Sequence, residues 1–166
     1  MRFVFSVLLI FPIFFYAQND KIQALEEQGI IVGVQTWSFR TMQDQSPLAI
    51  LKYIKHTGIK HVELMGNHVE PFVGIFEDSE NISKLRNEAS ISKFKELRKL
   101  YNDAGISIFA FKPRRCFEKY NTDDEIRYGM RAAKALGASH ITLEHPSDDE
   151  HTLRLSEIAD EEDILV

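Results

Sequence analysis

Two kinds of hydrophobic pattern alternate along this chain. Four short runs are apolar and rich in β-branched residues, at 29–39, 59–66, 106–113 and 140–146. This composition is typical of strands that are buried on both faces of a sheet. In four longer stretches, apolar residues instead recur at the spacing of one helical face, at 47–58, 90–104, 121–138 and 148–163. The pattern predicts four strands and four principal helices.

Local signals define the ends of these helices. Ser46 can cap the first helix, Pro47 can open it, and Gly58 can end it. Thr122 and Glu125 have the spacing of a capping box at the start of the third helix. The first helix is expected to present one face that contains Leu48, Leu51, Ile54 and Lys55.

One stretch departs from the alternation. Residues 67–89 contain Pro71, Gly74 and scattered acidic side chains, which predicts an irregular connection. At the far end of the chain, 164–166 has the composition of the first residues of a fifth strand.

Buried strands that alternate with amphipathic helices indicate parallel βαβ units. Such units build either a doubly wound sheet or a closed barrel. Doubly wound nucleotide-binding sheets usually carry a glycine-rich turn after the first strand. Residues 35–45, QTWSFRTMQDQ, contain no glycine. The sequence therefore predicts an α/β fold of the (β/α) TIM-barrel type, here an incomplete barrel of about four βα units.

Polar and aromatic side chains stand at the predicted carboxyl ends of the strands, where a barrel places its catalytic groups. They are Gln35 and Trp37 on the first strand, Glu63 on the second, Lys112 on the third, and Glu144 with His145 on the fourth. We predict a site there, although strands also end in polar residues simply because they reach solvent.

Each candidate has a structural alternative. Trp37 could stack on a sugar ring or pack in the core, and Lys112 could bind an anionic group or remain solvated. Glu63 could bind ligand or form an ion pair. Glu144 and His145 are the predicted catalytic pair, with a neighbouring basic partner for Glu144 and a surface position for His145 as the alternatives.

Three segments resemble a known family. GVQTWSFR at 33–40, GIKHVELMG at 58–66 and AKALGASHITLEHP at 133–146 are similar to the xylose isomerase-like TIM barrels, and more narrowly to the sugar phosphate isomerase/epimerase proteins. The resemblance covers roughly 30–166. It implies an eight-stranded barrel that moves a proton or hydride between adjacent sugar carbons.

The same resemblance implies a divalent metal (Mn, Mg, Co or Zn) for full-length members of the family. The family's metal ligands lie mainly on strands five to eight, so no metal ligand is assigned to this chain. Glu63 matches the family's glutamate on strand two. We predict substrate-binding roles for Trp37, Glu63 and Lys112.

The N-terminal segment has the pattern of a secretory signal peptide. Arg2 precedes an apolar run that contains Pro12 and reaches a small residue at Ala17. The run is shorter than the about 20 apolar residues of a membrane span, although a retained anchor is the alternative. We expect a signal peptide at 1–17, a lead-in at 18–29 and a partial barrel domain at 30–166. The expected location is secreted or periplasmic, without a stable membrane anchor.

Charge and cysteine content narrow the choice of partners. The net charge of −5 argues against nucleic-acid binding and thus against the related endonuclease branch. Cys116 is the only cysteine, and Arg114 and Arg115 beside it could lower its pKa. Cys116 could therefore be a nucleophile, and the alternative is a thiol with no chemical role.

The sequence thus predicts a sugar isomerase or epimerase that binds a small-molecule sugar. A non-catalytic periplasmic carbohydrate-binding protein is the alternative. Because a barrel of this type takes about 250 residues, we expect this chain to be an N-terminal fragment that is inactive alone. Its open sheet edges should favour self-association.

Overall fold

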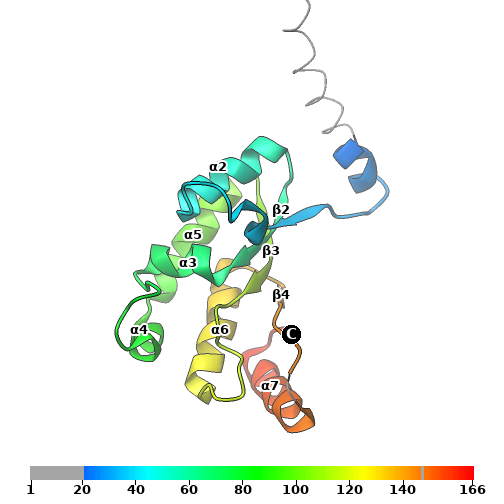
Figure 1. Cartoon of the computed structure of the whole chain (residues 1–166). Helices are drawn as coiled ribbons and strands as arrows, with labels where there is room; N and C mark the ends of the chain where they lie inside the picture. Colours follow the sequence, from blue (N-terminus) through cyan, green and yellow to red (C-terminus); the bar gives the residue numbers. More distant parts are fainter. Residues whose placement is uncertain (1–20, 147) are drawn as a thin grey trace, which may run out of the picture.

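A computed structural model describes residues 21–146 and 148–166 (Figure 1). After a helical turn at 21–26, the elements follow in the order β1 (Gly33–Gln35), η1 (Thr36–Phe39, a 3-10 helix), α2 (Pro47–Thr57), β2 (His61–Met65), α3 (Gly66–Val73), α4 (Ile82–Glu88), α5 (Ile91–Asp103), β3 (Ser107–Lys112), α6 (Asp123–Leu136), β4 (His140–Ile141) and α7 (Asp149–Glu162). The expected signal peptide at 1–17 lies outside the described residues. No described helix is long and apolar enough to span a membrane.

The four strands form one parallel sheet in which spatial order equals chain order, β1-β2-β3-β4. The register places Gln35 beside Glu63 and Met65 beside Lys112, with one irregularity between Val62 and Glu63. The predicted parallel α/β architecture is confirmed. In doubly wound sheets the strand order reverses at a switch point, and the described strands show no reversal.

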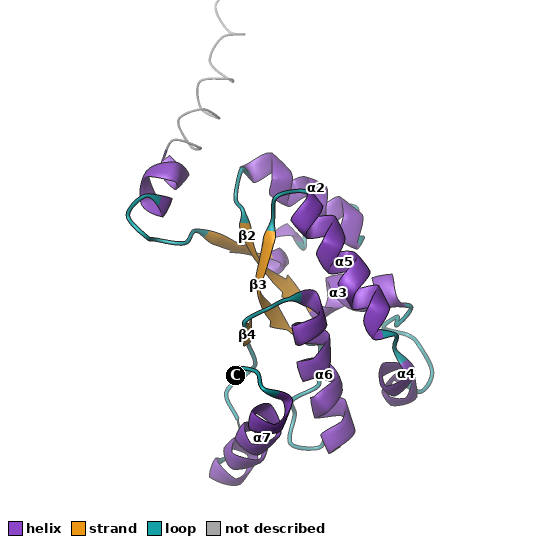
Figure 2. Ribbon diagram, turned by 180° about the vertical axis from the view of Figure 1, so that it is seen from behind, coloured by secondary structure: helices purple, strands orange, loops and turns teal. Residues whose placement is uncertain are grey.

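Helices cover one face of the sheet. In Figures 1 and 2, α2, α3, α5 and α6 lie on the same side of the strands in both views. The core between sheet and helices includes Leu64, Phe94, Phe111, Leu97 and Met130, each at most 1% exposed. Sealing this face supplies the main hydrophobic contribution to folding. It also fixes the strand ends that carry the candidate site.

The predicted helix ends are confirmed. The Ser46 hydroxyl accepts a hydrogen bond from the Ala49 amide at 3.3 Å, and Gly58 ends α2 with a φ of +75°, in the left-handed region that favours glycine. The capping box of Thr122 and Glu125 is present at the start of α6. These contacts satisfy backbone groups that would otherwise lack helical partners.

Two expected strands are shorter than the apolar runs suggested. The first run contributes only β1, because the chain turns into η1 where the Thr36 hydroxyl accepts a hydrogen bond from the Met65 amide at 2.9 Å. Trp37 therefore stands on a 3-10 turn beyond the strand. The fourth run pairs only at His140–Ile141, and the rest of it leaves the sheet as a loop.

The expectation of an irregular connection at 67–89 was wrong, because this stretch contains α3 and α4. Gly74 ends α3 in the left-handed conformation, with a φ of +90°. Asn81, also left-handed, caps α4 by accepting a hydrogen bond from the Lys84 amide. The turn residues that suggested irregularity therefore separate two short helices.

The predicted face of α2 was partly wrong. Its buried residues include Ala49, Ile50 and Ile54, while Leu48 is 48% exposed and Lys55 is exposed. A shift of one or two positions rotates a helical face by a large angle, at 3.6 residues per turn. His151 is buried at the start of α7.

Candidate functional site

Glu63 joins three strands at their carboxyl ends. Its Oε2 accepts a hydrogen bond from Gln35 Nε2 at 3.0 Å, and its Oε1 accepts one from the Thr142 hydroxyl. Gln35 ends β1, Glu63 lies on β2, and Thr142 follows β4. Parallel pairing aligns the strand ends, so side chains distant in sequence meet at one edge of the sheet. Glu63 is intermediate in exposure.

Lys112 and Glu144 form a second link between strand ends. Lys112 Nζ lies 2.6 Å from Glu144 Oε1, with the Lys112 side chain 26% exposed and that of Glu144 79% exposed. The hydrogen bond and charge of Lys112 hold the pKa of the Glu144 carboxyl below its usual value. Glu144 is therefore ionised at neutral pH. Lys112 is thus the neighbouring basic partner that the sequence suggested for Glu144.

A cavity of about 420 Å³ opens beside this pair. Trp37, Lys112 and Glu144 line it, as do Gln35 and Arg115. Four of the six strand-end candidates, Gln35, Trp37, Lys112 and Glu144, thus share one cavity. Its walls combine an exposed aromatic ring with amide, ammonium, guanidinium and carboxylate groups.

Glu63 and His145 stand apart from this cavity lining. Glu63 connects to it through Gln35, to which it is hydrogen-bonded. His145 is exposed, and its Nδ1 lies 2.8 Å from the Pro146 carbonyl oxygen, to which only a protonated nitrogen can donate. That hydrogen bond leaves Nε2 as the ring nitrogen available to a ligand.

Trp37 is held at the rim of the cavity. Its side chain is 47% exposed, and the Arg40 guanidinium lies 5.7 Å from the ring centroid. Arg40 Nη1 also donates a hydrogen bond to the Trp37 carbonyl oxygen at 3.2 Å. The ring is therefore not core packing, and part of its surface is accessible to a planar or apolar ligand face.

A buried histidine fixes the loop that carries Trp37. His68, 1% exposed, lies with Nδ1 2.9 Å from the Thr36 hydroxyl and Nε2 2.9 Å from Gln45 Oε1. Gln45 Nε2 donates to the carbonyl oxygens of Phe39 and Met42, which orients the amide so that Oε1 faces the ring. Asn67 Nδ2 lies farther from Nε2, at 3.3 Å, so the shorter contact with Gln45 Oε1 places the His68 proton on Nε2, and Nδ1 accepts from Thr36.

Burial lowers the pKa of His68, so the neutral ring is favoured. Because the Thr36 hydroxyl gives its proton to His68, its oxygen is free to accept from the Met65 amide. The chain of contacts ties the 36–45 loop to β2 and α3. The sequence carries no pattern that predicts this role for His68.

Arg114 and Arg115 follow β3 in a tight approach to the end of β2. A Cβ atom on Gly66 would lie 2.5 Å from the Arg114 backbone nitrogen, so only glycine permits this contact. Arg115 adopts a φ of +47°, an uncommon conformation for a residue with a side chain. Both arginines line the cavity. From the sequence, the two arginines were of interest only as neighbours of Cys116.

A buried ion pair anchors Arg114. Glu70 and Arg86 are 2% and 5% exposed, and Arg86 Nε and Nη2 each lie 2.8 Å from Glu70 Oε1. Arg86 Nη2 also donates to the Arg114 carbonyl oxygen, and Arg114 Nε lies 3.3 Å from Glu70 Oε2. The wall of the cavity is therefore connected to the core.

The charge state of this pair follows from its geometry. Burial raises the pKa of the Glu70 carboxyl, and the charges of Arg86 and Arg114 act against that rise. The pKa of Arg86 is raised too, although burial alone would lower it, because the Glu70 carboxylate attracts its charge and accepts hydrogen bonds from it. A raised Glu70 pKa favours a protonated carboxyl, whereas a raised Arg86 pKa requires an ionised one. The two 2.8 Å contacts from the Arg86 guanidinium to Glu70 Oε1 favour the ionised pair.

The Cys116 thiol lies under the arginines and is fully buried. Burial raises its pKa to about 12, and the Arg86 and Arg114 charges only partly oppose this. The expectation that the neighbouring arginines could lower this pKa was wrong, because desolvation of the thiolate outweighs their attraction. Cys116 is therefore a protonated core thiol.

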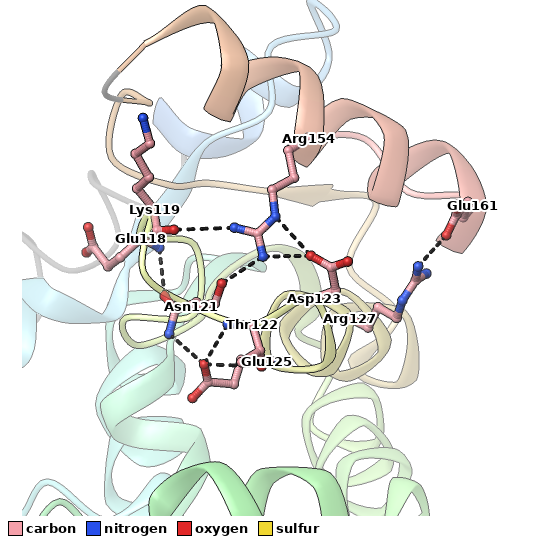
Figure 3. A network of polar contacts seen from close by, with 9 residues as sticks. All are labelled: Glu118, Lys119, Asn121, Thr122, Asp123, Glu125, Arg127, Arg154 and Glu161. Carbon is pink, nitrogen blue, oxygen red and sulfur yellow. Dashed lines mark hydrogen bonds and ion pairs between the residues drawn. The ribbon is translucent and has the colours of Figure 1, made fainter.

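A polar network fixes the loop that carries Glu118 (Figure 3). The Glu118 amide donates to Asn121 Oδ1 at 2.8 Å, and Asn121 Nδ2 donates to Glu125 Oε2 at 3.1 Å. Arg154 of α7 donates to the Asn121 carbonyl oxygen at 2.7 Å and to Asp123 Oδ1 at 2.6 Å. The 118–122 loop is thus held by both α6 and α7, and Glu118 lines the cavity.

The donor groups do not fit a divalent metal. No three histidine, cysteine, aspartate or glutamate side chains gather into a metal-binding group within 21–146 and 148–166. Glu63 is occupied by two hydrogen-bond donors, and Glu144 by the Lys112 ammonium. A divalent metal needs several oxygen or nitrogen ligands directed at one point, and these carboxylates are directed elsewhere.

Comparison with known proteins supports the fold alone. No protein-family model and no curated protein matches the chain. A crystal structure of an uncharacterised protein from Parabacteroides distasonis has a similar fold, with a TM-score of 0.56 and 22% sequence identity. The match covers 80% of this chain and 49% of that chain. The present chain therefore spans about half the length of that protein.

Proposed function

We propose that the chain is part of a (β/α) TIM barrel of the xylose isomerase-like type, a sugar isomerase or epimerase. The cavity at the strand ends is its sugar pocket. The observation that carries the proposal is the exposed Trp37 ring in one cavity with the Lys112–Glu144 pair. Sugars present an apolar C–H face and a polar rim, which suit an aromatic ring beside charged hydrogen-bonding groups.

The pair suits proton transfer next to a carbonyl. The Glu144 carboxylate would take a proton from the carbon beside the sugar carbonyl, and the Lys112 ammonium would donate a hydrogen bond to the carbonyl oxygen as negative charge develops there. Return of the proton to the former carbonyl carbon, with the hydroxyl proton of the first carbon passed to the former carbonyl oxygen, gives an isomer, and return to the opposite face of the same carbon gives an epimer. His145 Nε2 would serve as the second proton carrier.

Full-length members of this family are expected to use a divalent metal, such as Mn, Mg, Co or Zn. The described residues of this chain do not form its site. Glu63 holds Gln35 at the cavity wall and thus shapes the sugar pocket.

One observation favours a second function, non-catalytic carbohydrate binding in the periplasm. The lowered pKa of Glu144 keeps it ionised but also makes it a weaker base than a carboxylate tuned toward neutral pH. A binding protein would need the ion pair only as a hydrogen-bonding rim.

Sugar binding and proton transfer separate these functions. Saturation-transfer NMR with a panel of aldoses and ketoses, with and without Mn²⁺, Mg²⁺, Co²⁺ or Zn²⁺, should detect a bound sugar. Trp37→Ala should weaken that binding, whereas Leu48→Ala, at an exposed position on α2, should not. If Trp37→Ala binds sugar as tightly as the unaltered protein does, or if no sugar binds at all, both functions are overturned.

Net isomerisation is expected to be weak from an incomplete barrel, so a partial reaction is the better assay. An isomerase or epimerase should exchange the hydrogen next to the sugar carbonyl with solvent deuterium. Glu144→Gln should abolish this exchange while sugar still binds. Binding without exchange in the unaltered protein identifies the non-catalytic alternative.

A further inference from the structure

Arg115 is the cation of the cavity lining that lacks a partner among the described residues. Lys112 Nζ lies 2.6 Å from Glu144 Oε1, and Arg114 Nε lies 3.3 Å from Glu70 Oε2. Arg115 lines the same cavity and is exposed, and its guanidinium makes no ion pair or hydrogen bond with any described residue. A guanidinium always remains charged in proteins. The cavity therefore contains one fixed positive charge that can bind an anionic group.

Buried contacts hold Arg115 in an uncommon backbone conformation. Its φ of +47° lies in the left-handed region, which a residue with a side chain seldom adopts. The carbonyl oxygen of Arg114, just before it, accepts hydrogen bonds from Arg86 Nη2 and, at 3.3 Å, from the Cys116 thiol. Arg86 is 5% exposed and Cys116 is fully buried, so the loop is fixed from the core. Backbone strain that surrounding contacts maintain in this way is concentrated at ligand-binding sites.

The start of α3 lies against the same loop. Gly66, its first residue, approaches the Arg114 backbone so closely that a Cβ atom would lie 2.5 Å from the nitrogen. Gly66 and Asn67 line the cavity together with Arg115, and no side chain caps this end of the helix. The N-terminus of a helix carries a partial positive charge, which adds to the charge of Arg115. The guanidinium supplies the directed hydrogen bonds.

We propose that the cavity binds an acidic sugar, and that the Arg115 guanidinium binds its carboxylate. This inference rests on the proposed sugar pocket and names the class of sugar. A guanidinium can donate two parallel hydrogen bonds to one carboxylate, which fixes the orientation of the bound acid. The sugar ring would then lie against Trp37, with its carbonyl group at the Lys112–Glu144 pair.

The charges around the cavity favour a carboxylate over a phosphate. A carboxylate carries one negative charge, which the single unpaired guanidinium of Arg115 can neutralise. A phosphate monoester carries close to two negative charges at neutral pH. Glu118 and Glu144 also line the cavity and would repel the second charge. Lys112 does not offset it, because its ammonium is already paired with Glu144.

Matched sugars test the class of ligand. Glucose, glucuronate and glucose 6-phosphate differ only at the sixth carbon, and galactose and mannose provide the same three forms. Calorimetric titration at fixed ionic strength should show that the uronate of at least one set binds at least about tenfold more tightly than its neutral sugar and its phosphate. Equal binding of uronate and neutral sugar, tighter binding of the phosphate, or no binding of any of these compounds would overturn the inference.

Two variants test the role of Arg115. Arg115→Gln should bring the ratio of uronate affinity to neutral-sugar affinity close to one. Arg115→Gly should do the same and unfold at an equal or higher temperature, because glycine adopts the left-handed conformation without strain. Arg98→Gln removes an exposed arginine of α5 outside the cavity and should leave the ratio unchanged. A uronate preference that persists in both Arg115 variants would overturn the inference.

Trp37→Ala separates this inference from the proposed function. If neutral and acidic sugars bind equally and both depend on Trp37, the sugar pocket stands and the inference about Arg115 is wrong. If uronate binding depends on Arg115 but not on Trp37, the carboxylate contact stands and the proposed sugar pocket is wrong. We expect uronate binding to depend on both residues.

Discussion

The Thr142 hydroxyl donates a hydrogen bond to Glu63 Oε1, although 79 positions of chain separate the two residues. Thr142 follows β4 and Glu63 lies on β2, so the contact crosses over β3. Gln35, at the end of β1, donates to the other carboxylate oxygen. One carboxylate therefore connects the ends of the first, second and fourth strands.

Glu63→Gln should change ligand binding more than stability. The glutamine keeps one acceptor oxygen, and the Thr142 hydroxyl can rotate to accept a hydrogen bond in place of donating one. We expect the free energy of unfolding to fall by about 1 kcal/mol or less, while sugar binding weakens because Gln35 is no longer held by an anion. Urea unfolding and NMR titration measure the two effects. A large loss of stability with unchanged binding would make Glu63 a purely structural residue.

The Lys112–Glu144 contact predicts a specific change of pKa. Lys112 lowers the pKa of Glu144 by favouring its ionised form, so Lys112→Met should raise that pKa toward the ordinary value. Carboxyl ¹³C shifts followed through an acid titration measure it directly. Lys99→Met, which removes a lysine paired with Asp103 on α5, should leave Glu144 unaffected. An unchanged Glu144 pKa in the Lys112 variant would show that the ion pair does not form in solution.

Sequence patterns predicted the architecture better than the details of the site. Capping and glycine signals are local, and those at Ser46, Gly58 and Thr122 placed helix ends correctly. The run that contains Trp37 was expected to be strand throughout, but a contact from the Thr36 hydroxyl to the β2 backbone turns it into a 3-10 helix. Contacts of this kind, between distant segments, produce no periodic pattern in the sequence.

The same reason explains which site residues were found. Trp37, Lys112 and Glu144 were predicted from their positions after apolar runs, and the structure gathers them around one cavity. His68 and Glu70 were not predicted, since their roles depend on partners 23 and 16 positions away. The roles of the predicted residues in sugar chemistry stay predictions.

The neutral His68 ring predicts that the protein becomes less stable as the pH is lowered. Its folded-state pKa is lowered by burial, so the unfolded chain binds a proton more readily, at the ordinary histidine value of about 6.5. Its contribution to stability is present above that value and is lost as pH falls through it toward the folded pKa. Urea unfolding from about pH 8 to pH 5.5 should show the loss, and His68→Gln should reduce the slope. His145→Gln, at an exposed position, is the control, and an identical slope in both variants would contradict the neutral buried ring.

The buried Glu70–Arg86 pair predicts a strong dependence of each partner on the other. Glu70→Gln keeps the shape of the side chain but leaves the Arg86 guanidinium buried without its counter-charge, which costs about 3–5 kcal/mol in comparable pairs. Arg86→Met combined with Glu70→Gln removes both charges, so the double variant should be more stable than the sum of the two single effects. Arg86 also donates to the Arg114 carbonyl oxygen, and that loss stays in the double variant.

Chemical unfolding of the four proteins in this cycle gives the coupling between the two residues. Asp103→Asn, which breaks the exposed Lys99–Asp103 pair on α5, is the matched control and should leave stability nearly unchanged. Glu70→Gln should also disturb the cavity, because Arg114 depends on Glu70 for its position. We therefore expect Glu70→Gln to weaken sugar binding at temperatures where the protein is still folded. Additive single effects, with binding intact, would mean that the core pair and the cavity wall are independent.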